Sequence, residues 1–364
     1  MDNKNNTQET VLHFLRIGLG EKDVYNAEHG WEKVYDEAAQ LGVSPFVFDG
    51  YVKKYDAREL VSEMPVAEKM KWIATVFNSE ALSATHETTA NDLAHIFAEG
   101  GLRTYVLKGY VIAECYPQPK HRQSVDLDCF LVSAEDQNNF DSWEKGNLLI
   151  EKHGFSVARD FYKISTFHLP QLMVENHKFL TPFRGNKYLT KLEAFLQGLI
   201  RADEGKDKID DTELLRPPVM ASALFLVEHS FSHFLHEGLN LRHITDWMMF
   251  SRYHKDDISW PQFESYIDEF GFRRFYDAYV HVGKYVLGDI PFEQLTAPEQ
   301  RMMNSVWEGL DLHDTVRGFR GKLNLVGNTF RARWKYKYFS PISMIHALWI
   351  QVKGFLFIKQ PKLN

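Results

Sequence analysis

Two aspartates, Asp126 and Asp128, stand two residues apart inside a run of branched and aromatic residues, 125–132. This composition predicts a β-strand, and the two-residue period of a strand puts both carboxylates on one face. Carboxylates held so close repel each other unless a cation lies between them, and their hard oxygen atoms suit Mg²⁺ or Mn²⁺. The pair therefore predicts a divalent metal site. Two solvated acids on an exposed strand are the alternative.

A phosphate-binding loop is predicted upstream of the aspartates. Lys108 and Gly109 lie where a short apolar run, residues 104–107, gives way to a helical stretch. Because glycine has no side chain, backbone N–H groups at such a junction can approach phosphate oxygens. Arg122 follows in a loop and adds a second cation. The alternative for Gly109 is a simple turn.

A third carboxylate is expected from a later strand. Glu175 and His177 occupy alternate positions of the run 172–180. The period of two then allows Glu175 to share the sheet face of the first two acids. The alternative is that both residues lie on the solvated face of an antiparallel strand.

Two further groups fall on predicted helices. His229, His233 and His236 recur at spacings that share one helix face, which suits a metal site. No glutamate stands where a metalloprotease general base would, so packing or hydrogen-bonded histidines are the favoured interpretation. Arg242 and Asp246 are four residues apart and are expected to pair along a helix.

The surrounding elements predict an α+β fold in three parts. Apolar residues at helical spacing predict a helical N-terminal region, residues 1–101. Residues 102–183 alternate strand and helix, which predicts a small mixed β-sheet core. Residues 184–364 again read as helical and are expected to pack against this core as a helical C-terminal region. The last strands of the core are expected to form a meander over residues 155–160, 163–169 and 172–180.

Charge is distributed unevenly along the 364 residues. The formal net charge is -7, which argues against a sequence-specific nucleic-acid binder because such proteins need a concentrated basic surface. From position 315 onward, however, ten Lys and Arg residues occur without one Asp or Glu. Aromatic residues alternate with these basic ones between 331 and 339. This tail predicts a membrane-surface or acidic partner, with a solvated helix face as the alternative.

The chain is expected in the cytoplasm, either free or peripheral to a membrane. Its two cysteines, Cys115 and Cys129, form neither a disulfide framework nor a zinc knuckle, which favours a reducing compartment. The polar N-terminus predicts no signal peptide. The most apolar stretch, residues 342–358, contains His346, Gln351 and Lys353, so no transmembrane segment is predicted.

A set of motifs in fixed order resembles a known family. The motifs are Val106-Leu107-Lys108-Gly109, Tyr116-Pro117, Arg122, the strand 125–132 with its two aspartates, Val174-Glu175-Asn176-His177, Gly238-Leu239-Asn240-Leu241-Arg242 and Asp246-Trp247. Together they cover residues 104–250 and resemble the uncharacterised nucleotidyltransferase family of the polymerase-beta-like nucleotidyltransferase superfamily. One departure is Tyr110, which follows the glycine where the superfamily usually has serine.

The resemblance implies transfer of a nucleoside monophosphate from an NTP to a hydroxyl acceptor. Asp126, Asp128 and Glu175 would bind Mg²⁺ or Mn²⁺, and Glu175 would also accept the hydroxyl proton. Two further groups of residues have expected roles: the triphosphate would be held by Lys108, Gly109 and Arg122, and the site would be supported by His177, Arg242 and Asp246. The acceptor stays open among a small molecule, a sugar and a protein. Tyr110 keeps a second hypothesis open, a catalytically silent nucleotide-binding or scaffolding protein of the same fold.

Overall fold

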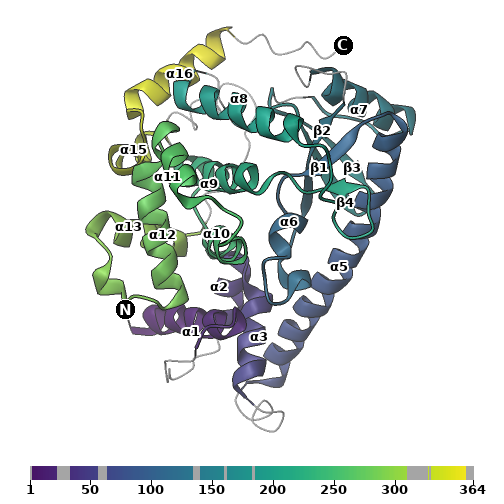
Figure 1. The fold of residues 1–364 in the computed structure, drawn as a ribbon. Helices are drawn as coiled ribbons and strands as arrows, with labels where there is room; N and C mark the ends of the chain where they lie inside the picture. Colours follow the sequence, from purple (N-terminus) through teal and green to yellow (C-terminus); the bar gives the residue numbers. More distant parts are fainter. Residues whose placement is uncertain are drawn as a thin grey trace.

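In the computed structural model of the chain, a mixed β-sheet is surrounded by helices (Figure 1). The structure describes residues 2–22, 33–55, 64–133, 140–159, 162–182, 185–309, 327 and 329–357. The helices before the sheet are α1 (Asp2–Gly18), α2 (Val34–Gln40), α3 (Ser44–Lys54) and α5 (Val66–Glu99). The helices after the first four strands are α8 (Lys187–Ala202), which precedes the short fifth strand, and then α9 (Val219–His236), α10 (Leu241–Tyr253), α11 (Trp260–Glu269), α12 (Arg273–Leu287), η3 (Phe292–Gln294), α13 (Ala297–Trp307), α15 (Arg333–Phe339) and α16 (Met344–Phe357). This arrangement confirms the predicted α+β class.

The sheet has five strands in the order β3-β4-β2-β1-β5. The strands are β1 (Arg103–Val106), β2 (Asp126–Val132), β3 (Ile164–Leu169), β4 (Leu172–His177) and β5 (Leu214–Leu215). Strand β2 pairs antiparallel with β1 and parallel with β4. Between the strands lie α6 (Tyr110–Ala113), the 3₁₀ helix η2 (Pro119–His121) and α7 (Phe140–Lys152). Strand β2 therefore lies in the middle of the sheet, with its carboxylates between two neighbouring strands.

The predicted meander is partly wrong. Strands β3 and β4 do form an antiparallel pair close to the expected ranges. In the described part of the range 155–160, however, Ala158 makes only an isolated bridge to Thr166. Strand β5, which was not predicted, is two residues long and pairs parallel with β1. A strand this short has no periodic pattern from which it could be recognised.

Alternation along β2 separates two hydrophobic layers. Leu127, Cys129 and Leu131 pack against the long helix α5, which crosses one face of the sheet (Figure 1). Phe130 belongs to the other layer, together with side chains of α8 and α9. Because residues two apart share a face, Asp128 lies on the α9 side with Phe130. The site is therefore covered by the helices that follow the sheet.

The N-terminal helices join the same hydrophobic layer as the C-terminal helices. Helices α1 and α3 cross at two glycines, where a Cβ on Gly18 would lie 1.9 Å from the carbonyl oxygen of Phe46. Arg16 on α1 donates to the backbone carbonyls of Tyr285 and Val286 at the end of α12. The first and last helical regions are thus in direct contact. The division at residues 101 and 183 stays a prediction.

His121 connects η2 to two N-terminal helices. Its Nδ1 lies 2.7 Å from Asp49 Oδ2 on α3, and its Nε2 lies 3.2 Å from Glu80 Oε1 on α5. Burial lowers the pKa of His121, but the hydrogen bonds to the two carboxylates outweigh burial and raise the pKa above 6.5. The protonated ring has a donor for each carboxylate. Protonated His121 therefore stabilises the contact between α3, η2 and α5.

This raised pKa predicts a pH-dependent stability. The folded state binds more protons than the unfolded state between the two pKa values, so the stabilisation is complete below about 6.5 and is lost as the pH rises through the folded-state pKa. The difference in free energy of unfolding between wild type and His121→Gln is expected to shrink from about pH 6 to pH 8. Urea unfolding at several pH values measures this difference. The exposed His153→Gln is the matched control, and a difference that does not vary with pH would contradict the assignment.

Candidate functional site

The pairing of β2 with β4 brings three expected site residues together. Asp128 stands opposite Glu175 in the parallel register, and His177 lies two residues further along β4. His177 Nε2 is 3.0 Å from Asp128 Oδ1 and 3.7 Å from Glu175 Oε2. Burial lowers the pKa of His177, but these two carboxylates outweigh burial and raise it. The two carboxylates thus favour the protonated form of His177, and the charge of that form would partly neutralise theirs.

Lys108 approaches the same acids from the end of β1. Its Nζ lies 3.0 Å from Asp128 Oδ2 and 3.9 Å from Asp126 Oδ2. Burial raises the pKa of Asp128, yet the charges of Lys108 and His177 reverse this and hold the pKa well below its usual range. Burial is the largest cause of a raised pKa at Asp126. The pKa values of the two aspartates are thus shifted in opposite directions although both lie on one strand face.

The donor set fits a hard divalent cation. Ligand atoms of Asp128, Glu175 and His177 all lie within 4.8 Å of one another. Asp128 Oδ2 is buried and accepts no hydrogen bond from a described residue, so its ionic contact with Lys108 is the one a cation would replace. Carboxylate oxygens are the ligands that Mg²⁺ and Mn²⁺ prefer. Asp126 lies beside this group and shares Lys108 with Asp128.

Gly109 occupies a backbone position that few other residues adopt. Its φ is +70°, and a Cβ placed there would lie 3.0 Å from Ser124 Oγ. The helix that follows, α6, has only four residues. Ser124 was not predicted as a site residue, because a lone serine in a loop has no distinguishing pattern. Its hydroxyl donates to the backbone carbonyl of Asp126 at 3.1 Å, which connects the loop to β2.

Arg122 is already paired with a carboxylate. Its Nε and Nη2 donate to Asp246 Oδ1 and Oδ2 at 3.1 and 2.7 Å, and Tyr116 donates its hydroxyl to the same carboxylate at 2.7 Å. All three side chains are buried. The expected pairing of Asp246 with Arg242 is therefore wrong, because Arg122 reaches Asp246 from a different element. This paired guanidinium connects the loop before β2 to α10.

Arg242 is left as a cation without a carboxylate partner among the residues that the structure describes. Its Nη1 donates to the backbone carbonyl of Gln123 at 3.1 Å. The side chain lies on Gly42, where an added Cβ would come within 3.2 Å of Arg242 Cβ. Burial and the neighbouring charge of Arg122 lower the pKa of Arg242. Arg242 lines a narrow pocket together with Asp126.

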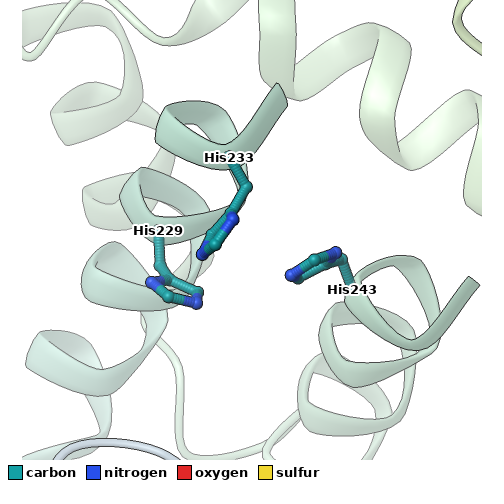
Figure 2. Close-up of side chains that lie close together, drawn as sticks. All are labelled: His229, His233 and His243. Atoms are coloured by element: carbon teal, nitrogen blue, oxygen red, sulfur yellow. The ribbon is translucent and has the colours of Figure 1, made fainter. Parts of the chain in front are cut away.

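Three histidines gather next to this pocket, and two of them, His229 and His243, line it, but the three are not those that helical spacing suggested. Figure 2 shows His229 and His233 on α9 facing His243 from α10. The ring centroid of His233 lies 4.4 Å from the ring centroid of His229 and 4.8 Å from that of His243. His236 is exposed at the end of α9 and is not part of this group. Only the packing of α10 on α9 makes His243 the third member.

The chain matches one family model. The model, described as an uncharacterised nucleotidyltransferase, matches residues 27–288, which is more than half of the 364 residues. No curated protein and no solved structure matches the chain. The matched range contains the motif-bearing residues 104–250 and confirms the resemblance that those motifs carry. The chain therefore belongs to the uncharacterised nucleotidyltransferase family.

Proposed function

We propose that the protein transfers a nucleoside monophosphate from an NTP to a hydroxyl acceptor and releases pyrophosphate. The observation that carries the proposal is the register of Asp128 opposite Glu175, with Asp126 on the same sheet face. Membership of a nucleotidyltransferase family supports an NTP as the donor substrate. The acceptor is a small molecule, a sugar or a protein that offers a hydroxyl group.

Asp126, Asp128 and Glu175 would hold Mg²⁺ or Mn²⁺. Such ions stabilise negative charge on the attacking and leaving oxygens of a phosphoryl transfer. Glu175 is the carboxylate that we assign to the acceptor side, where it accepts the hydroxyl proton. His177 positions both Asp128 and Glu175 through the contacts at 3.0 and 3.7 Å.

The cations around these acids would orient the triphosphate. Lys108 is near both aspartates, so its ammonium group can contact a phosphate bound beside them. Gly109, whose φ is +70° and whose missing Cβ leaves room for Ser124 Oγ, is assigned to the loop that would approach the triphosphate. Arg122 is better assigned to support than to direct phosphate contact, because Asp246 already occupies two of its N–H donors.

A second hypothesis is a protein that binds nucleotide without turnover. Tyr110 replaces the usual serine after Gly109, and its hydroxyl is buried without a hydrogen bond among the described residues. The loop then offers no hydroxyl at this position to a phosphate. The two hypotheses differ in one measurable result, because only an active enzyme releases pyrophosphate in the presence of an acceptor.

Asp128→Ala is expected to remove the Mg²⁺-dependent part of ATP affinity. The substitution deletes the carboxylate that lies closest to Lys108 and His177, so a cation loses its central ligand. Isothermal titration calorimetry with ATP, in Mg²⁺ and in EDTA, measures the effect. The exposed Asp211→Ala is the matched control and should behave as wild type. Equal affinity and equal metal dependence in Asp128→Ala and wild type would remove this site from the proposal.

A further inference from the structure

The narrow pocket beside Asp126 is lined mostly by hydrogen-bond donors. Lys108, Arg242, His229 and Ser230 contribute to its wall, together with His243 from α10. Asp126 lies at one side of the pocket, so a ligand here would be next to the proposed reaction centre. Two guanidinium-bearing residues line the pocket: Arg122 is paired with Asp246, which also lines it, whereas the half-buried Arg242 has no carboxylate partner among the described residues. Burying an unpaired charge is unfavourable, and a bound anion would remove that cost.

The position of the hydrogen on the His243 ring decides whether the histidine group suits a cation or an anion as its ligand. The backbone N–H of Asn240 donates to His243 Nδ1 at 3.2 Å, and Asn240 Oδ1 accepts from the backbone N–H of His243 at 3.0 Å. A neutral imidazole whose Nδ1 accepts a hydrogen bond carries its hydrogen on Nε2. The ring points toward His229 and His233 (Figure 2). His243 therefore presents an N–H donor to the group, which suits an anion and does not suit a metal ion.

The local charge also favours an anion over a metal ion at the histidine group. Burial, together with the charges of Lys108 and neighbouring histidines, lowers the pKa of His229 well below 6.5. Burial and the neighbouring His233 and Arg242 have the same effect on His243. Charges that disfavour a proton on these rings would also disfavour a divalent cation between them. The same charges attract an anion.

We propose that this pocket binds a phosphate group, with Arg242 as its principal contact and His229 and His243 as further donors. A planar guanidinium matches two phosphate oxygens, and neutral imidazole N–H groups add hydrogen bonds. The inference rests on the proposed function and makes it more specific, because the phosphate belongs to a substrate. It comes either from the polyphosphate of the NTP or from a phosphorylated acceptor.

Binding of inorganic pyrophosphate to the full chain in EDTA tests the pocket without the metal site. Arg242→Gln is expected to weaken pyrophosphate binding at least about tenfold, because a charged hydrogen-bond donor is lost. The matched control is Arg252→Gln, an exposed arginine on the same helix, which should bind as wild type. His229→Gln is a second variant, with an expected loss of about fivefold. Circular dichroism and urea unfolding establish that each variant is folded.

The outcomes separate the sources of the phosphate. Weaker binding of both pyrophosphate and ATP to Arg242→Gln assigns the pocket to the NTP. Weaker pyrophosphate binding with unchanged ATP affinity assigns it to a phosphorylated acceptor. Wild-type pyrophosphate binding by both folded variants would overturn the proposal, as would stoichiometric Zn²⁺ binding that is lost in His233→Gln. Because the pyrophosphate titrations contain EDTA, they can fail while the Mg²⁺-dependent test of Asp128 succeeds, and the reverse; the Zn²⁺ titration is carried out separately, without EDTA.

A separate observation concerns the C-terminal helices α15 and α16. All 49 acidic residues precede position 315, whereas ten of the 42 Lys and Arg residues follow it. On α16, Ile345, Trp349 and Val352 form a stripe at helical spacing and are 74%, 57% and 36% exposed. Arg333 and Lys337 of α15 line one groove with Ile345. Exposed apolar and basic side chains thus share one surface.

We infer that this surface binds an anionic membrane. Tryptophan prefers the membrane interface, and basic residues beside an apolar stripe are attracted to acidic headgroups. No helix in the described ranges is long and apolar enough to cross a bilayer. Lys353 Nζ lies 5.1 Å from the Trp349 ring centroid, so charge and apolar surface are adjacent on α16 as well. The acidic remainder of the chain would face away from such a membrane.

Vesicle cosedimentation tests this surface. Wild type is expected to bind phosphatidylcholine vesicles that contain phosphatidylglycerol and not to bind pure phosphatidylcholine vesicles. Trp349→Ser and Arg333→Glu should each weaken binding about fivefold. Phe77→Ser removes an aromatic side chain of similar exposure, 69%, from α5 and is the control. Unchanged vesicle binding by both tail variants would overturn the inference. So would a wild-type protein that binds single-stranded RNA or polyglutamate but does not bind the vesicles.

Discussion

Glu175→Gln is expected to slow nucleotidyl transfer by about 100- to 10,000-fold, the usual effect of losing a general base. NTP affinity should change little. Glutamine keeps the shape of the side chain opposite Asp128 but lacks the negative charge that favours proton removal from the acceptor hydroxyl. The loss therefore falls on the transition state more than on the bound substrate.

The measurement is single-turnover transfer from radiolabelled NTP to an acceptor found by screening hydroxyl compounds and proteins. Calorimetry with the same NTP establishes that binding is preserved. Glu99→Gln changes an exposed glutamate at the end of α5 and is the matched control. A rate for Glu175→Gln within a few-fold of wild type would exclude Glu175 from the mechanism and leave the aspartates without this partner.

Asp246→Ala is expected to lower the free energy of unfolding by about 3–5 kcal/mol, because it leaves a buried charge without its partner. The charge is that of Arg122, which is only 9% exposed. Asp246 also accepts the hydroxyl of Tyr116, so two buried donors lose their acceptor together. The contact joins α10 to the loop before β2, and its loss should loosen the site as well as the fold.

Urea unfolding measures this change. The double variant Arg122→Met/Asp246→Ala should lose less stability than Asp246→Ala alone, because no buried charge is left unpaired. Asp257→Ala removes an exposed carboxylate near His254 and should change stability by less than about 1 kcal/mol. A loss of that small size for Asp246→Ala would contradict a buried, hydrogen-bonded ion pair.

The contact of Asp246 with Arg122 also shows that the motif residues on α10 make different contacts. Arg242, Asp246 and Trp247 lie close together in the sequence but make different contacts, although Arg242 and Asp246 line the same pocket. Arg242 faces the pocket, Asp246 pairs with Arg122, and Trp247 is buried with its ring 5.5 Å from Phe263. Helical spacing alone would group Arg242 with Asp246. The structure pairs Asp246 with Arg122 instead, because the loop before β2 packs on α10.

Local features of the sequence determined much of what holds the site. The strand period put Asp126 and Asp128 on one face. Strand β2 begins at Asp126, one residue after the start of the predicted run 125–132. Pro65 and the pair of glycines at 100 and 101 bound α5, a single helix of 34 residues. The fixed order of motifs was enough to identify the family. The strand period and the helix ends depend on residues close together in the chain, where sterics and hydrogen bonding are local.

Contacts between distant segments were decided only by the tertiary structure. The register of β2 against β4 sets Asp128 opposite Glu175, and such parallel pairing joins strands far apart in the sequence. Arg122 displaces Arg242 as the partner of Asp246 because the loop before β2 packs on α10. His243 completes the histidine group because α10 packs on α9. Periodicity can assign a residue to a face of a strand or helix. Which residues contact that face depends on tertiary packing and on the cost of burying charge.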